Sequence, residues 1–247
     1  MRPRKKHNLA PRLAACEAIT ILEPESEKGR IRERFADPSR PLHVELGCGK
    51  GLFIRTLAAR HPECNFIAVE REPNVMVTAM EQALLTPLPN LYFILGDADR
   101  LPNIFEPGEL SRIYINFCDP WHKRRQYKKR LTWRGRLEMY KTLLEPDGEI
   151  WFKTDNYMLY HFSTFEFDAC MDRYFSTDDL HHSEYAAGNI LTEYETYFSN
   201  LAQPIRSLPP RLLCNLPFLN TTFFAKKVTQ KTLIDCAPTS ETSPPLI

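Results

Sequence analysis

The sequence predicts an α/β protein in which helices cover both faces of a mostly parallel sheet. Short runs rich in β-branched and aromatic residues are bounded by turn-forming residues, as expected of buried strands. Segments with helical periodicity lie between these runs, and this alternation favours parallel strands joined by crossover helices. Three of the nine glycines lie together just after the first strand-like run. A glycine-rich turn between a strand and a helix is typical of this fold class.

The elements can be placed in order along the chain. The expected strands cover residues 42–47, 65–70, 91–96, 112–117 and 149–154. The expected helices between them cover residues 52–60, 73–85 and 132–144, and in the last the apolar residues recur at offsets of four, three and four, as on one helical face. Further along, helices are expected over residues 156–171 and 192–201, and a closing strand over residues 221–227.

Composition divides the chain into three parts. Residues 1–40 are rich in basic residues and interrupted by proline, and we expect a basic N-terminal arm there. Residues 41–231 carry the alternating pattern and are expected to form one folded domain. Residues 232–247, rich in Thr, Ser and Pro, are expected to form a flexible tail.

Charge is balanced over the whole chain but not along it. The 32 basic residues offset 31 acidic residues, giving a formal net charge of +1. Between Pro120 and Leu137 no acidic residue occurs, and the basic residues there are Lys123, Arg124, Arg125, Lys128, Lys129, Arg130, Arg134 and Arg136. This basic segment (residues 123–136) predicts a local positive field on a nearly neutral molecule.

The cysteine pattern and the hydropathy argue against a metal site and a membrane location. The seven cysteines show neither a Cys-x-x-Cys pair nor the Cys/His spacing of a zinc finger. This usage suits a reducing, cytoplasmic location and predicts no metal. Residues 13–16 have the form of a lipoprotein cleavage box, but basic residues precede them instead of an apolar run. No apolar run is long enough to cross a bilayer, so no membrane partner is expected.

The turn after the first strand indicates a ligand site. Gly47, Gly49 and Gly51 allow the backbone of this cofactor turn (residues 47–51) to approach a ligand at a helix N-terminus. Glu45 precedes the turn. Glu70 ends the second strand nineteen residues after Gly51, where this architecture holds a ribose by its hydroxyls.

Two cofactors compete for such a turn, a dinucleotide and S-adenosylmethionine. The third glycine comes one residue too early for G-x-G-x-x-G, and Glu45 would place a carboxylate near the pyrophosphate. A carboxylate there suits a ligand with an amine and a positive charge, and S-adenosylmethionine carries both. Asp97, after the third strand, is a candidate acceptor for the adenine amino group. The competing interpretation is that these acids only cap helices and turns.

The fourth strand ends in the corner Asp119-Pro120-Trp121 (residues 119–121). The carboxyl ends of central strands face the ligand crevice in this fold class, so the corner should lie beside the cofactor. Proline stiffens the turn, and the tryptophan ring offers a surface for a base. The basic segment that follows is suited to phosphates, although a solvated charged face or a localisation signal would have the same composition.

Together these motifs make the sequence resemble the bacterial tRNA (guanine-N7-)-methyltransferase family. They occur in order between residues 2 and 206 and are "HVELGCGKG", "FIAVE", "GDAD", "INFCDPWHKRRQYKKRL", "FKTDN" and "TEYETYF". The resemblance implies a Rossmann-like class I methyltransferase with a mostly parallel, seven-stranded sheet. It also implies methyl transfer from S-adenosylmethionine to N7 of guanine-46 in the variable loop of tRNA. Whether the protein is a monomer or a homodimer stays open.

The resemblance also implies roles for individual residues. Cofactor contacts are expected at Glu45, Gly47, Gly49, Glu70, Asp97 and Asp119, and Asp119 is also the expected catalytic residue. Substrate contacts are expected at Lys123, Asp155, Thr192, Glu193, Tyr194 and Glu195. Thr192 and Glu195 also have the spacing of a capping box, a role that can coexist with substrate contact.

Methylation at N7 sets modest chemical demands, because N7 already carries a lone pair and needs no general base. In-line positioning and negative charge near the purine are what help. We expect Asp119 to supply both by accepting from the guanine N1 and N2 donors, with Asp155 as the second candidate.

The sequence departs from the family pattern at His122, Gln126, Tyr127 and Tyr197, which bear on tRNA contacts. Three alternatives remain. They are an S-adenosylmethionine enzyme acting on amino groups, a nicotinamide oxidoreductase, and a non-catalytic tRNA-binding relative. The first typically has two prolines in its corner, where this chain has one before Trp121. The third is disfavoured because all four expected cofactor carboxylates are present.

Overall fold

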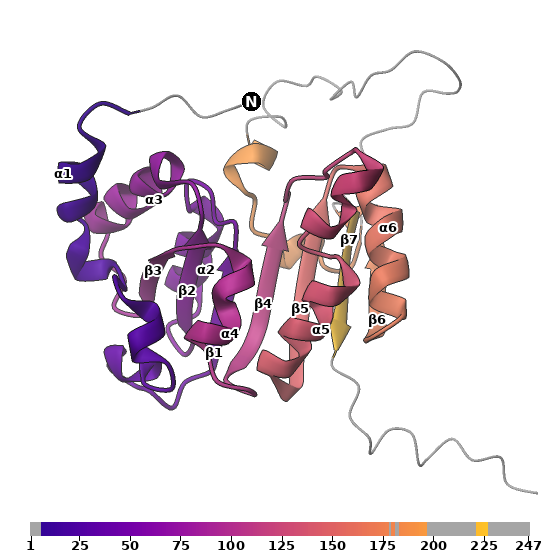
Figure 1. The fold of residues 1–247 in the computed structure, drawn as a ribbon, viewed down its shortest axis with the longest axis horizontal. Coiled ribbons are helices and arrows are strands. Elements are labelled where there is room, and N and C mark those ends of the chain that lie inside the picture. Colours follow the sequence, from indigo (N-terminus) through magenta and orange to yellow (C-terminus); the bar gives the residue numbers. More distant parts are fainter. Residues whose placement is uncertain (1–5, 178, 181–182, 197–220, 227–247) are drawn as a thin grey trace, which may run out of the picture.

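The protein is built around one twisted sheet (Figure 1), and the computed structural model describes residues 6–177, 179–180, 183–196 and 221–226. The strands are β1 (Leu42–Leu46), β2 (Asn65–Glu70), β3 (Leu91–Leu95), β4 (Leu110–Asn116), β5 (Leu144–Thr154), β6 (Asp172–Thr177) and β7 (Thr221–Lys226). The labelled α-helices are α1 (Leu9–Ala14), α2 (Leu52–Arg60), α3 (Pro73–Leu85), α4 (Leu101–Ile104), α5 (Arg134–Leu143) and α6 (Tyr157–Asp168), and residues 193–196 form a further helical turn. Short 3₁₀ turns include Ala98–Arg100 and Arg124–Lys129.

The strand order is β3-β2-β1-β4-β5-β7-β6. The neighbours from β3 to β5 pair in parallel, whereas β7 runs antiparallel to both β5 and β6. The chain moves outward from β1 to β3 and then returns across β1 to β4. This reversal creates a crevice at the carboxyl ends of β1 and β4, which is where ligands bind in open α/β sheets.

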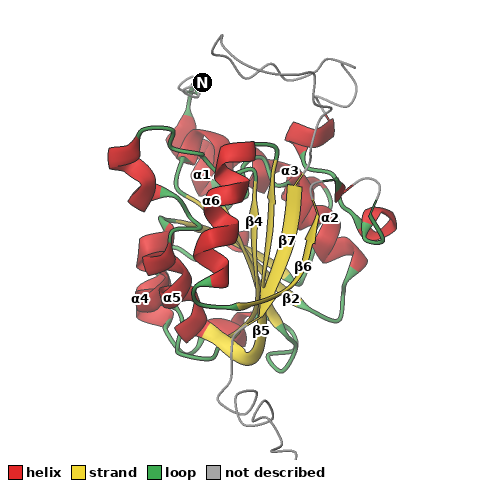
Figure 2. Cartoon of the chain, turned by 90° about the vertical axis from the view of Figure 1, so that its right-hand side faces the viewer, coloured by secondary structure: helices red, strands yellow, loops and turns green. Residues whose placement is uncertain are grey.

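Side chains alternate along each strand and therefore build two separate cores. On one face Val44, Ile115 and Phe152 pack with residues of α4, α5 and α6. On the other face Phe66, Phe93 and Tyr114 pack with α2 and α3. Figure 2 shows the sheet between these two groups of helices. The predicted fold class, a mostly parallel α/β sheet with helices on both faces, is therefore confirmed.

The described part of the expected N-terminal arm packs against the sheet. Cys16, Ile21, Ile31 and Phe35 are buried, and the Ile21 amide donates to the carbonyl of Phe93 at 2.8 Å. The Arg12 guanidinium donates to both carboxylate oxygens of Glu81 on α3, at 2.6 Å each. These contacts bring residues 6–40 against β3, α3 and the core beneath them.

Several element boundaries differ from the sequence expectation. The helix expected over residues 132–144 ends at Leu143, because Leu144 already pairs with Leu110 across β4 and β5. The helix expected to reach residue 171 ends at Asp168. Strand β6 follows it and was not predicted. Apolar and polar residues do not alternate clearly along β6, which lies at the edge of the sheet and has no buried residue. Its pairing partner β7 lies far along the chain, so local sequence gives little sign of this strand. Residues 197–201 and 232–247, where a helix continuation and the tail were expected, lie outside the described residues.

Candidate active site

A cavity of about 340 Å³ opens at the carboxyl ends of β1 to β4. It is lined by Leu46, Gly47, Val69, Glu70, Arg71, Glu72, Val75, Gly96, Asp97, Ala98, Phe117, Cys118, Asp119, Trp121, Lys129, Leu131 and Arg136. The topology thus brings together four positions that the sequence predicted for the cofactor site, namely Gly47, Glu70, Asp97 and Asp119. They come from the ends of β1, β2, β3 and β4, which are adjacent in the sheet.

The cofactor turn is shaped by its three glycines, which have φ angles of +78° at Gly47, +59° at Gly49 and +80° at Gly51. Such angles are unfavourable for residues that carry a Cβ atom. A Cβ on Gly51 would also lie 2.8 Å from the Cβ of Ala79, so α2 can approach α3 only because this residue is glycine. At Gly47 and Gly49 a Cβ would meet no atom within 4 Å, which leaves the inner side of the turn open to a ligand.

Glu45 lies beside this turn but points to the α2 face of the sheet, and it is not among the residues that line the cavity. Its Oε1 accepts from the Nδ2 of Asn116 at 2.8 Å, while its Oε2 is buried without a partner among the described residues. The pKa of Glu45 is raised to about 8, mainly by burial and in smaller part by the nearby Glu193 carboxylate. Asn116 and Lys153 act in the opposite direction on this pKa. A buried acceptor of this kind suits a ligand that brings a cationic N–H donor.

Glu70 and Asp97 line the cavity and also hold the local backbone. Glu70 accepts from the amide of Gly49 at 3.1 Å with one oxygen and from the amide of Glu72 at 3.0 Å with the other. Asp97 caps the 3₁₀ turn Ala98–Arg100 by accepting from the Asp99 amide at 3.1 Å. The interpretation of these acids as capping groups is therefore correct for both. It does not compete with ligand binding, since a carboxylate has room for further donors.

The corner after β4 has an unusual backbone. Phe117 has a φ of +49° and Trp121 a φ of +42°, both in the left-handed region that bulky residues rarely adopt. The Arg130 guanidinium holds this conformation by donating to the carbonyls of Pro120 at 2.8 Å and Trp121 at 3.3 Å. The strained corner projects Asp119 into the cavity rim, where 66% of its side chain is exposed.

Asp119 and Trp121 share a cationic neighbour that sequence reasoning did not identify. The Nη2 of Arg71 lies 3.1 Å from the Oδ2 of Asp119, and its guanidinium lies 5.7 Å from the centre of the Trp121 ring. The ammonium of Lys129 lies over the same ring at 5.0 Å. Arg71 directly follows Glu70 at the end of β2, so its position near this rim could have been inferred from the rule that parallel strands end at one edge of the sheet.

The basic segment divides into an exposed and an engaged part. Its exposed members, which include the predicted substrate residue Lys123, are Lys123, Arg124, Arg125, Lys128 and Lys129. The others make internal contacts. Arg130 binds the corner, Arg134 lies 3.6 Å from Glu166, and Arg136 lies 2.7 Å from Asp99. The exposed positive charges therefore gather on the 3₁₀ turn Arg124–Lys129 and at Lys123 before it, next to the cavity.

Four of the remaining predicted substrate residues, Asp155, Thr192, Tyr194 and Glu195, lie together near the end of β5, whereas Glu193 contacts the amide of Leu52 on α2. Thr192 and Glu195 form the expected capping box, in which the Glu195 amide donates to Thr192 Oγ1 at 3.1 Å and the Thr192 amide to Glu195 Oε2 at 2.8 Å. The Tyr194 hydroxyl donates to Asp155 Oδ2 at 2.7 Å. The Tyr194 ring lies 5.2 Å from that of Phe117, so this group adjoins the corner.

Two buried residues of the site, Asn116 and Lys153, were not predicted. Lys153 lies within the "FKTDN" motif on β5, with its ammonium 3.0 Å from Glu195 Oε2. A lysine inside a buried strand requires an anionic partner, and this rule is the signal that could have found it. Burial lowers the pKa of Lys153, while Glu195 and Glu45 oppose the shift.

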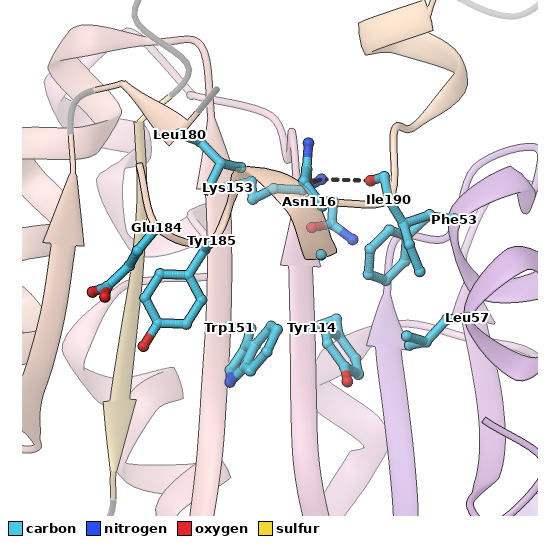
Figure 3. A pocket seen from close by; sticks show the side chains of 12 residues that line it. Phe53, Leu57, Tyr114, Asn116, Trp151, Lys153, Leu180, Glu184, Tyr185 and Ile190 are labelled. Carbon is cyan, nitrogen blue, oxygen red and sulfur yellow. Dashed lines mark hydrogen bonds between the residues drawn. The ribbon is translucent and has the colours of Figure 1, made fainter. Parts of the chain in front are cut away.

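A second cavity of about 210 Å³ lies on the α2 face, lined on one side by Leu180 and by residues between 184 and 190 (Figure 3). Phe53, Leu57, Tyr114 and Trp151 form much of its wall, with Asn116 and Lys153 at one end. Asn116 thus stands between this apolar cavity and Glu45, to which it donates.

Two kinds of feature are absent from the described residues. None of the helices there is both long and apolar enough to cross a membrane. Nor is there, in the same part of the chain, a group of three or more His, Cys, Asp or Glu side chains arranged to hold a metal ion.

The sheet order, the glycine turn at the switch point and the cavity beside it define a class I methyltransferase fold. Among solved structures, the chain is similar to the 16S rRNA methyltransferase KamB, with a TM-score of 0.55 over 81% of this chain and 92% of that chain. The two sequences are 12% identical, so this similarity concerns the fold alone.

Sequence comparisons are more specific. A family model described as "Putative methyltransferase" matches residues 39–208. The tRNA (guanine-N(7)-)-methyltransferase of Brevibacillus brevis is 48% identical, covering 72% of this chain and 83% of that relative. The protein of the same name from a Geobacillus species is 42% identical, covering 81% of this chain and 90% of that relative. The chain belongs to the bacterial tRNA (guanine-N7-)-methyltransferase family.

Proposed function

We propose that this protein transfers the methyl group of S-adenosylmethionine to N7 of guanine-46 in the variable loop of tRNA, in the cytoplasm. The names of its relatives support the reaction and the substrate class. The observation that carries the proposal is the position of Asp119. Its exposed carboxylate lies at the rim of the cavity at the switch point, next to exposed basic residues that suit a polyanion.

The cofactor would be held by the acids around the cofactor turn. Glu70 and Asp97 line the cavity and can accept from the ribose hydroxyls and the adenine amino group. Oε2 of Glu45, which has no partner in the part of the chain that the structure describes, can accept from the ammonium of the amino-acid part. When bound, S-adenosylmethionine supplies a methyl group activated by the positive charge on sulfur.

The reaction needs positioning rather than proton transfer. The N7 lone pair forms the new N–C bond, the bond between carbon and sulfur breaks, and its electron pair stays on sulfur. No proton moves, but the purine becomes cationic. Asp119 accepts from the guanine N1 and N2 donors, orients the base, and stabilises the positive charge as it develops. Its ion pair with Arg71 is exposed and therefore costs little to exchange for these contacts.

The basic segment brings the substrate to this acidic site. Carboxylates around the cavity repel phosphates, so attraction has to come from the neighbouring cations. With about five exposed basic groups each neutralising one phosphate, log Kd should change with log salt by a slope of about 4 to 5. Trp121, flanked by Arg71 and Lys129, offers a ring on which a base can stack.

The test is a methylation assay on unmodified tRNA with radiolabelled S-adenosylmethionine, followed by chemical cleavage at 7-methylguanosine. Cleavage at position 46 is expected, with loss of label in a tRNA that carries adenine at that position. The Asp119→Asn variant should lose turnover, since its amide has no net charge to stabilise the cationic purine.

The alternatives give different results in the same assay. Label on an exocyclic amine, detected by mass spectrometry of nuclease digests, would identify an amino-group methyltransferase. Binding of NAD but not of S-adenosylhomocysteine in calorimetry would identify an oxidoreductase. Either result would reject the proposal, and so would wild-type turnover in Asp119→Asn.

A further inference from the structure

Residues 189–195 form a bridging segment that contacts β5 through Lys153 and the start of α2, directly after the cofactor turn, through Glu193. The ammonium of Lys153 on β5 donates to three acceptors of this segment, namely Asn189 Oδ1 at 3.0 Å, the Ile190 carbonyl at 2.9 Å and Glu195 Oε2 at 3.0 Å. Figure 3 shows the bond from Lys153 to Ile190. The Lys153 and Glu195 side chains are 9% and 1% exposed, so this is a buried ion pair.

A buried ion pair is a costly way to add stability, and its better-supported use is to fix one arrangement of the groups it joins. Here the ion pair fixes the helical turn of residues 193–196. Glu195 binds Lys153 and the Thr192 amide through the same oxygen, so the capping box and the ion pair are locked together. Both side chains of the capping box are therefore occupied inside the protein.

This arrangement places the Glu193 carboxylate at the start of α2, directly after the cofactor turn. Its Oε1 accepts from the amide of Leu52 at 2.8 Å, across 141 residues of sequence. Leu52 is the first residue of α2, and the preceding Gly51 has no side chain with which to cap the helix. Glu193 thus satisfies one of the backbone amides that a helix start leaves unpaired.

We propose that Glu193 is a positioning residue for the cofactor turn, held in place by the Lys153–Glu195 ion pair, and not a tRNA contact. Family resemblance assigns its position to substrate binding. The structure instead directs its carboxylate to the backbone amide of Leu52 at the start of α2, and the residue is half-buried. This inference rests on the proposed function only in taking S-adenosylmethionine as the ligand of the turn.

The consequence concerns affinity for the cofactor. The turn contains three glycines with positive φ, so its backbone is intrinsically free and depends on contacts to stay ordered. The hydrogen bonds that tie it to its surroundings are donated by backbone amides. Those of Gly47 and Cys48 donate to the Val69 carbonyl, that of Gly49 donates to the Glu70 carboxylate, and that of Leu52, just after the turn, donates to the Glu193 carboxylate. Removing the hydrogen bond between Leu52 and Glu193 leaves the turn more mobile. The turn then has to become ordered when the ligand binds, and this lowers the affinity.

The experiment measures two affinities for each variant of the full chain. Calorimetry gives the Kd of S-adenosylhomocysteine without tRNA, and filter binding gives the Kd of tRNA at saturating S-adenosylhomocysteine. Glu193→Ala should weaken S-adenosylhomocysteine binding about fivefold, the size expected for a lost helix cap, with tRNA affinity within about twofold of wild type. Glu193→Gln, whose amide oxygen can still accept from Leu52, should restore most of the loss.

Two further variants serve as comparisons. Glu184→Gln neutralises an exposed acid on the segment before the bridge and should change neither affinity. Lys153→Met should reproduce the effect of Glu193→Ala on S-adenosylhomocysteine. Because it leaves the buried Glu195 unpaired, its thermal melting is recorded first, and if it does not fold the Glu193 variants decide alone.

The outcomes separate the inference from the proposed function. The inference is overturned if Glu193→Ala leaves S-adenosylhomocysteine affinity unchanged, or if it weakens tRNA binding at saturating S-adenosylhomocysteine. A wild-type protein that binds S-adenosylhomocysteine but does not methylate guanine N7 would reject the proposed function. The effect of Glu193→Ala on the turn would still support the inference in that case.

Discussion

The buried carboxylate of Glu45, whose Oε2 has no partner among the described residues, leads to a prediction about stability and pH. Its pKa is raised from an ordinary 4.5 to about 8, mainly by burial. Because the folded-state pKa lies above the unfolded-state value, the folded protein binds the extra proton between these pH values. The associated stability is fully present below pH 4.5 and is lost as pH rises towards 8. Replacement by glutamine removes this loss, since an amide does not ionise.

The magnitude follows from the two pKa values. Between pH 6.5 and pH 8.0 the unfolded chain keeps Glu45 ionised, while the folded protein goes from nearly full to half protonation. Integration over this range gives a loss of about 1.5 kcal/mol in the free energy of unfolding. Burial lowers the pKa of His43 to about 3, so over this range His43 titrates only in the unfolded chain. Its contribution is the same in wild type and in Glu45→Gln, and it cancels when the two are compared.

Urea unfolding at pH 6.5 and pH 8.0 measures the effect. From pH 6.5 to pH 8.0 the free energy of unfolding of the wild type should fall by about 1.5 kcal/mol more than that of Glu45→Gln. The control Glu17→Gln, which changes an exposed acid, should show the same fall as the wild type. If wild type and Glu45→Gln show the same change with pH, then Glu45 is ionised throughout, and the argument for a buried acceptor awaiting a cation is wrong.

Further predictions concern the ligands and the turn. Glu45→Gln should weaken S-adenosylhomocysteine binding about tenfold or more in calorimetry, because a charge-assisted hydrogen bond is lost; unchanged affinity would remove Glu45 from the cofactor site. Asp119→Asn should lower turnover about a hundredfold with a much smaller effect on that affinity; equal losses in both would make Asp119 a cofactor ligand only. The double variant Lys123→Ala/Arg124→Ala should reduce the salt slope of tRNA binding by about 1.5 to 2 without changing S-adenosylhomocysteine binding, and an unchanged slope would mean that these side chains do not meet phosphates. Gly51→Ala should destabilise the protein by about 1 to 3 kcal/mol in urea unfolding, because of its positive φ and the clash with Ala79, whereas Gly188→Ala, where a Cβ meets open space, should not.

Local sequence was enough to place most of the central sheet. Strands β1, β2 and β3 were predicted to within a residue of their observed ends, because short apolar runs between turn residues have few other ways to bury themselves. The N-terminal half of β5 and the edge strand β6 were not predicted. The first contains Pro146 and Gly148, which read as a turn, and the second depends on pairing with β7 more than 40 residues away.

The sequence by itself determined the residue types near the end of each strand. Glutamates lie at the ends of β1 and β2, aspartates follow β3 and β4, and cations follow the aspartate after β4. Parallel strands place such ends at one rim, so the cavity around Gly47, Glu70, Asp97 and Asp119 could be anticipated. Only the tertiary structure decided the direction of each side chain. It turned Glu45 to the α2 face, paired Asp119 with Arg71, and brought Glu193 to the amide of Leu52. These contacts join residues far apart in sequence, and no local pattern specifies them, because they arise when separate elements pack against the same sheet.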